Sequence, residues 1–488
     1  MKKEDLFEAI NDIDDREIEA AKRYRKPEAA SRAAKRDRKA LFTRWASVAA
    51  CLVVLIAAVV LGRLQSGNGS STSVPEGVKV VSAKPVEEVA PGMSVIDFLE
   101  GGKRMEWWGS YRDKMEESAG YQKEMGGYYS AMMQQLLEAE DENTVCSPLN
   151  IYLALSMLAE VTEGNTRAQI LEQLEVPDIE TLRTRVTAME ASNQVNTPTL
   201  KSLLANSLWL NDSVNYNSET LERLADLYRA STYSGRPGSS EMDQALREWI
   251  DSNTGGLLKE YTKDLELEPE NVLTLVSTLY YRASWTDDFY KQATDRGIFH
   301  GAKGDTEVDM MHRSDSMNVY WTDDFAALGL YLRDSGAMYF YLPQEGADVN
   351  DLLSNPDIFK AMQYGEDENR YYRNVNLTVP KFKVSEKTDL KETLEELGIT
   401  DAMDEKLADF SPLTTEEMLL SVSGAEHAAT VEIDENGVIG AAYTEITTDG
   451  ASMPPEETVD FVLDRPFLFV ITARDGSLLF AGVVRNVE

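Results

Sequence analysis

The chain has 488 residues, is 43% hydrophobic and carries a formal net charge of −36, which allows one large domain or two to three ordinary ones with a substantial core. The acidic excess falls on residues 93–488, which hold 32 basic and 71 acidic side chains. A surface of this sign repels a phosphate backbone, so nucleic-acid binding is excluded, and the field favours cationic partners.

The cysteines and histidines indicate neither a disulfide framework nor a metal centre. Cys51 lies in an apolar segment and Cys146 far downstream of it, so a bridge between them is geometrically implausible and both are expected as small buried hydrophobes. The three histidines are isolated in the sequence, so we predict no metal and no other cofactor.

The N-terminal part of the chain reads as a membrane anchor. Residues 45–62 (WASVAACLVVLIAAVVLG) carry no charge, and as a helix they would span about 27 Å, close to a bilayer core of about 30 Å. Residues 1–44 contain 13 Lys and Arg, whereas only three follow up to residue 92. This asymmetry predicts a single-pass protein of the cell membrane, with 1–44 cytoplasmic and the C-terminal mass outside. A cleaved signal peptide is the alternative, but its basic region would be unusually long.

Three further segments follow the apolar stretch. Residues 63–92 are rich in Ser, Gly and Pro and are expected to form a flexible stalk. Residues 93–120 look helical, contain Trp107 and Trp108, and form an N-terminal extension whose role the sequence does not reveal. Residues 121–488 have the texture of a globular domain.

Within the main domain, helical patterns dominate the first half and strand patterns the second. The run NVLTLVSTLYYRASW (271–285) is rich in β-branched and aromatic residues and predicts a buried strand. Residues 467–485 read as strand, Asp-Gly turn and strand, which is typical of a hairpin. Together these patterns predict an α+β fold with large sheets.

Several blocks of this domain agree, in order and spacing, with one family. They are NTVCSPLNIYLALSMLAEVTEGNTRAQI (143–170), WIDSNTGGLLKEY (249–261), LVSTLYYRASWTDDF (275–289), VPKFKV (379–384), VEIDENG (431–437) and DRPFLFVITARDGSLLFAG (464–482). Over 121–488 the chain resembles a serpin, and its DRPFLFVI ending is most similar to prokaryotic members. With its N-terminal apolar segment, the chain resembles prokaryotic membrane-anchored serpins. The resemblance implies three β-sheets, about nine helices and an exposed reactive-centre loop, in a monomer that is not an enzyme.

The resemblance also implies a mechanism. In inhibitory serpins a protease cleaves the exposed loop, and the loop then inserts into the main sheet and traps the acylated serine protease. The hinge is expected at Glu435, Gly437, Val438, Ile439, Gly440, Ala441, Ala442 and Tyr443. As a strand, the loop would carry no charge on the face that begins with Val438, whereas Glu445 and Asp449 lie on the other face. Inhibitory relatives usually have Thr or Ser in place of Val438 and alanine in place of Tyr443, and the bulky Tyr443 is expected to slow insertion.

The reactive bond is expected between Ala451 and Ser452, because Ala451 lies sixteen residues after Glu435 and Ser452-Met453-Pro454-Pro455 resembles the sequence that follows the bond in some relatives. Thr448–Asp449 is the second choice. A small alanine suits a shallow apolar pocket, so the predicted partners are elastase-like or subtilisin-like serine proteases.

Four residues align with the polar cluster, called the shutter, beneath the main sheet of serpins: Ser147, Asn150, Ser277 and His427. We expect them to hydrogen-bond and to hold the sheet closed. The alternative function is a non-inhibitory serpin that acts as a surface binding module. A hydrolase is excluded because Ser147 lacks a nucleophile elbow, and a calcium loop at 432–443 is excluded because Tyr443 stands where a glutamate is needed.

Overall fold

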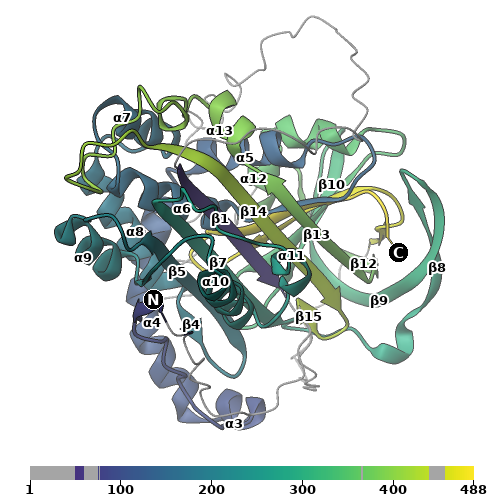
Figure 1. The fold of residues 1–488 in the computed structure, drawn as a ribbon. Coiled ribbons are helices and arrows are strands. Elements are labelled where there is room, and N and C mark those ends of the chain that lie inside the picture. The colour runs from purple at the N-terminus through teal and green to yellow at the C-terminus, as the bar shows by residue number, and fades with distance from the viewer. Residues whose placement is uncertain (1–49, 60–74, 76, 364–366, 439–456, 488) are drawn as a thin grey trace, which may run out of the picture.

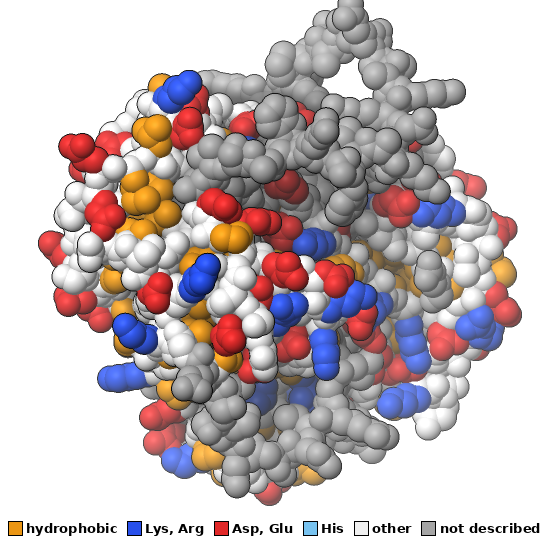
Figure 2. All heavy atoms as spheres, in the orientation of Figure 1, with side chains coloured by type: hydrophobic (Ala, Val, Ile, Leu, Met, Phe, Trp, Pro, Cys, Tyr) orange, Lys and Arg blue, Asp and Glu red, His pale blue; other side chains and the backbone are white. Residues whose placement is uncertain are grey.

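The computed structural model describes residues 50–59, 75, 77–363, 367–438 and 457–487. Two nine-stranded sheets form its centre, and helices cover them (Figure 1). The α+β prediction is confirmed. Acidic side chains are spread among Lys and Arg over the face shown in Figure 2 and do not gather into one patch.

The first sheet has long central strands, and most side chains of β5 and β7 are buried. Its strands, in spatial order, are β13 (Phe382–Asp389), β14 (Ser421–Asp434), β1 (Ala50–Val59), β7 (Leu273–Ser284), β5 (Leu200–Asn211), β6 (Ala230–Gly235) and β2 (Lys79–Val81). Two short strands complete it: β15 (Gly437–Val438) joins β14 to β7 at one end, and β4 (Val195–Asn196) pairs with β5. The predicted buried strand in 271–285 is β7, so that prediction is confirmed.

The second sheet contains the C-terminal hairpin. Its strands, in order, are β16 (Thr458–Val462), β12 (Arg370–Pro380), β9 (Gly304–Trp321), β10 (Phe325–Tyr331), β11 (Ala337–Pro343), β17 (Phe467–Thr472), β18 (Leu478–Val484) and β3 (Thr144–Cys146), with β8 (Asp295–Gly301) paired to β9. The predicted hairpin is β17–β18. Three sheets were expected, but the described strands form two. The 18-residue strand β9 pairs with β10 and also with β12, so these strands belong to one continuous sheet.

Helices surround the sheets, and one fills the centre. The described residues form α3 (Val95–Glu100), α4 (Gly102–Gln122), α5 (Gly126–Leu137), α6 (Pro148–Glu160), α7 (Gly164–Gln173), α8 (Ile179–Asn193), α9 (Ser218–Leu227), α10 (Ser240–Asn253), α11 (Lys259–Thr262), α12 (Asp357–Met362) and α13 (Lys391–Glu396), with 3-10 helices η1 (Lys291–Ala293), η2 (Val349–Ser354) and η3 (Asp401–Met403). Helix α6 is buried along its whole length and contacts both β7 and β18. The expected nine helices are exceeded because several helices have only four to six residues, too few for periodicity to reveal.

The apolar segment predicted as a membrane helix contains a strand in the structure. Residues 50–59 form β1, which runs parallel to both β14 and β7 and lies between them (Figure 1). Within the described ranges, no helix combines the length and apolarity that a membrane crossing needs. An apolar segment can satisfy its backbone groups in a helix or between two strands, and apolar residues at successive positions also suit a strand covered on both faces. The apolar composition of residues 45–62 is therefore compatible with a helix and with a buried strand, and we predicted only the helix.

Residues 63–92 were expected to form a flexible stalk, but from residue 77 onward the described part of this segment packs on the first sheet. Strand β2 adds to the edge of the first sheet by antiparallel pairing with β6. The Arg229 guanidinium donates to the Lys84 carbonyl at 2.6 Å, and the Val89 amide donates to the Asn196 carbonyl at 2.9 Å. An edge strand such as β6 offers free backbone groups, which a polar segment can pair without a hydrophobic pattern of its own.

Proline at Val54 tests the position of β1. Val54 aligns with Val276 on one side and Glu426 on the other, and proline removes a donor from a central strand. We expect Val54→Pro to accelerate amide exchange in β7 and β14, measured by mass spectrometry. Glu87→Pro, in the exposed connection after β2, is the control. Unchanged exchange in β7 and β14 would show that β1 does not pair there.

Candidate functional site

The end of β14 forms a tight turn that leads into the predicted loop. The Asn436 amide donates to the Asp434 carboxylate at 2.8 Å, and β15 begins at Gly437. Gly437 has φ +154°, and a Cβ atom there would lie 2.2 Å from the Ala283 carbonyl oxygen. Only glycine allows the chain to approach β7 so closely.

Glu435, the first predicted hinge residue, is buried and ion-paired. Its carboxylate lies 2.6 Å from the Lys381 ammonium and accepts a hydrogen bond from the Thr294 hydroxyl at 2.8 Å. Burial by itself would raise the pKa of the Glu435 carboxyl, but the hydrogen bonds from Lys381, the backbone and Thr294 outweigh it and lower that pKa below its usual value. The carboxylate therefore stays charged and anchors the turn at neutral pH.

Val438 already belongs to the first sheet. It is fully buried and pairs with Ile433 of β14 and Ala283 of β7, antiparallel to both. The other predicted hinge residues, Ile439, Gly440, Ala441, Ala442 and Tyr443, and the predicted reactive bond Ala451–Ser452, lie outside the described residues.

Two aromatic residues for which the sequence predicted no role hold the turn from the β7 side. The Trp285 indole N–H donates to the Asp434 carbonyl at 2.9 Å, and the Trp285 backbone amide donates to the Asn436 carbonyl at 3.1 Å. The Phe289 amide donates to the Glu435 carbonyl at 3.0 Å. Trp285 closes the long strand block that carried the resemblance, so its position was visible in the sequence, but its hydrogen bonds were not.

The four predicted shutter residues are all buried and form two pairs. The Ser277 hydroxyl donates to the Asn150 side-chain oxygen at 2.6 Å, and the Asn150 amide donates to the Ser277 carbonyl at 3.1 Å. On the other side, the Ser147 amide donates to the His427 Nε2 at 3.0 Å.

Strand β1 separates these two pairs. Leu55 of β1 aligns with His427 on β14 and with Ser277 on β7, so the two strands are not in contact at this level. In this structure β1 occupies the position between the two pairs. The expected role of the cluster, to hold the sheet closed, stays a prediction.

A family model described as Serpin (serine protease inhibitor) matches residues 129–487. The chain belongs to the serpin family. This family includes protease inhibitors. The predicted serpin fold is confirmed.

Curated relatives of this serpin include known inhibitors by name. Alpha-1-antitrypsin from Meriones unguiculatus is 30% identical over 372 residues, which cover 74% of the chain and 87% of the relative. Leukocyte elastase inhibitor from Equus caballus is 29% identical over 352 residues, with 70% and 92% covered.

Solved serpins share the fold. The thermophilic serpin tengpin in its native state gives a TM-score of 0.65 at 23% identity, over 83% of this chain and 100% of tengpin. Thyroxine-binding globulin in complex with thyroxine gives 0.62 at 25% identity, over 74% and 98%. The similar proteins thus include one that is named for binding a small molecule.

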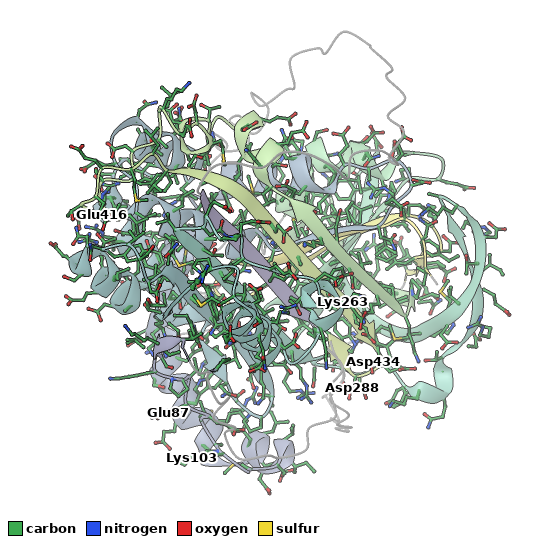
Figure 3. All side chains as sticks on the ribbon, in the orientation of Figure 1. Glu87, Lys103, Lys263, Asp288, Glu416 and Asp434 are labelled. Atoms are coloured by element: carbon green, nitrogen blue, oxygen red, sulfur yellow. The ribbon has the colours of Figure 1, made fainter. Side chains whose placement is uncertain are left out.

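A carboxylate beside the hinge carries a raised pKa. Asp288 lies next to Asp434 below β15 (Figure 3). Burial raises the pKa of Asp288 to about 6; nearby Asp287 and Asp434 add to the rise, and Arg333 and Arg313 partly offset it. The native serpin therefore binds this proton more tightly than the unfolded chain, whose Asp titrates near pH 4.

Asp288→Asn should stabilise the serpin in a pH-dependent way. Because the folded pKa is raised, the wild type loses stability as the pH rises from about 4 to about 6, and the loss persists above that window. We expect the midpoint of urea unfolding to increase in the variant at pH 7.5 and to match the wild type at pH 4. Asp323→Asn, at an exposed position, is the control. An equal gain at both pH values would mean that the Asp288 charge is not responsible.

Proposed function

We propose that this serpin is a suicide inhibitor of serine proteases, cleaved at Ala451–Ser452 and inserted into the first sheet with the acylated protease attached. The observation that carries the proposal is the position of Val438. The first inward-facing residue of the loop is already buried between β14 and β7, in the antiparallel direction that further insertion would follow.

The register extends this argument into the loop. If the loop continued past Val438 in the same register, Gly440 would align with Tyr281 and Thr444 with Ser277. The face that begins with Val438 would enter the core without a charge, whereas Glu445 and Asp449 would lie on the opposite face. Burying an unpaired carboxylate would cost several kcal/mol, so the position of these two charges favours insertion.

Strand β1 and the inserted loop require the same place. Residues 52–59 align with 274–281 of β7, and the extended loop would pair with those same residues. Insertion therefore requires β1 to leave the sheet. A membrane location for residues 45–62, with 1–44 in the cytoplasm and the serpin domain outside, would remove β1 and free the position; this location rests on the sequence alone.

The proposed targets are elastase-like or subtilisin-like proteases. A side chain as small as that of Ala451 suits a shallow apolar pocket and offers no cation to a trypsin-like one. The name of one relative, leukocyte elastase inhibitor, supports the first class. The second candidate function, a non-inhibitory binding module, is favoured by the likeness to thyroxine-binding globulin.

Mixing with elastase tests the inhibitor directly. Residues 75–488, which lack β1, and the full chain are each incubated with pancreatic and with neutrophil elastase, followed by denaturing gels and mass spectrometry. We expect a complex that survives denaturation and a released peptide that begins at Ser452, with more complex from the shorter chain. Cleavage without a complex, and without a gain in thermal stability of the cleaved chain, would favour the binding module.

Substitution at Val438 tests whether its face enters the core. Val438→Glu would place a carboxylate at a fully buried position, so insertion should become slower than release of the protease. We expect the covalent complex to decrease by about tenfold or more, with cleaved serpin in its place, since a barrier higher by about 1.4 kcal/mol already slows a step tenfold. Val438→Thr keeps the shape and should retain the complex. Equal amounts of complex from both variants would contradict the proposed face.

A further inference from the structure

The N-terminal extension lies before the region matched by the family model, yet it packs as part of the domain. Helix α4 buries a stripe of residues at helical spacing: Trp107, Tyr111, Met115, Ser118, Ala119 and Gln122. Trp107 stacks on Tyr111 with ring centroids 5.0 Å apart, and the Arg474 guanidinium lies 5.1 Å from the Trp108 ring. The stripe covers α8, so α4 has a fixed place on the body of the serpin.

The first turn of α4 is bound to a turn of the second sheet. The Arg104 guanidinium donates two hydrogen bonds to one carboxylate oxygen of Asp334, at 2.7 and 3.0 Å. The Asp334 side chain is only 4% exposed, and its other oxygen accepts from the Thr199 hydroxyl at 2.6 Å, just before β5. Arg104 forms an ion pair with this buried carboxylate, and Arg474 also acts on it electrostatically. Loss of Arg104 would remove two hydrogen bonds from one carboxylate oxygen and part of the compensating charge.

The backbone of Asp334 reinforces this dependence. Asp334 has φ +58°, a left-handed conformation that a residue other than glycine rarely adopts. The hydrogen bonds from Arg104 and Thr199 fix the side chain of the residue that holds this conformation. The turn 331–336 therefore has its shape set in part by a helix outside the family region.

The same turn holds the end of β7 that receives the loop. The Arg333 amide donates to the Ser284 carbonyl at 2.8 Å, and the Thr286 amide donates to the Tyr331 carbonyl at 2.8 Å. The Tyr281 and Ser335 hydroxyls share a hydrogen bond of 2.7 Å. Ser284 pairs with Gly437 of the hinge, and Trp285 holds the hinge turn. An unbroken series of contacts thus runs from Arg104 through Asp334 and β7 to the hinge.

We propose that Arg104 is a positioning residue for loop insertion: by fixing Asp334 it holds the receiving end of β7 in register with the hinge. This inference rests on the proposed inhibitory function, because positioning matters only if the loop inserts. It gives residues 93–120 a role that their composition does not reveal.

Hydrogen exchange in the full chain tests the positioning role without a protease. In Arg104→Met, which keeps the aliphatic stem, we expect exchange in peptides 281–286 and 433–438 to rise about fivefold, the effect of roughly 1 kcal/mol of lost coupling. Lys103→Met is the matched control, because Lys103 is the preceding residue and pairs with Glu106 on the exposed face of α4. Arg104→Lys, which keeps the charge, should lie between the wild type and Arg104→Met and remains informative if Arg104→Met does not fold.

The second measurement is the partition of protease-treated serpin between covalent complex and cleaved product. Arg104→Met should shift it about twofold or more toward cleaved product, since a receiving strand out of register slows insertion. Exchange that rises only in 95–122 and 331–336, with an unchanged partition, would overturn the positioning role and leave a structural one. If the wild type forms no complex with any protease while exchange at 433–438 still rises, the inhibitory function fails and the contact path stands.

Discussion

The row of backbone hydrogen-bonding groups between β14 and β7 is the constraint on which the rest of this serpin depends. These two strands run through the core of the first sheet with β1 between them, and their buried N–H and C=O groups that face each other need hydrogen-bond partners. In this structure β1 supplies those partners along most of the length, and β15 supplies them at the hinge end. The mechanism proposed here exchanges one occupant for the other.

The hinge shows how a segment can be fixed and still be ready to continue into the sheet. Glu435 is held by a buried ion pair with Lys381, and Gly437 passes so close to β7 that no side chain would fit. Val438 is then placed with its side chain in the core. These contacts set the direction and the register of the strand before the remainder of the loop is involved, so that the cost of initiating insertion has already been met.

The described residues 77–122, which precede the family region, pack against both sheets. Strand β2 covers the free edge of β6, the connection to α3 bonds to Asn196 and Arg229, and α4 reaches the turn that carries the end of β7. One consequence is that the two sheets are linked by a segment that lies before residues 129–487, the region matched by the family model. Lys103, labelled in Figure 3, pairs with Glu106 on the exposed face of α4, whereas the neighbouring Arg104 pairs with the buried Asp334.

The roles expected for the hinge and shutter residues stay predictions, but the sequence alone predicted the family, the α+β fold, the central strand β7 and the C-terminal hairpin. It could do so because each of these depends on local periodicity, on turn chemistry or on blocks whose order is a property of the chain. Three features could be seen only in the folded chain: residues 50–59 pair as a strand, Leu55 separates Ser277 from His427, and Arg104 binds Asp334. An apolar segment satisfies its backbone equally well in a helix or between two strands, and an ion pair between residues 230 positions apart leaves no periodic trace. Which solution is adopted depends on the partner groups that the rest of the fold presents.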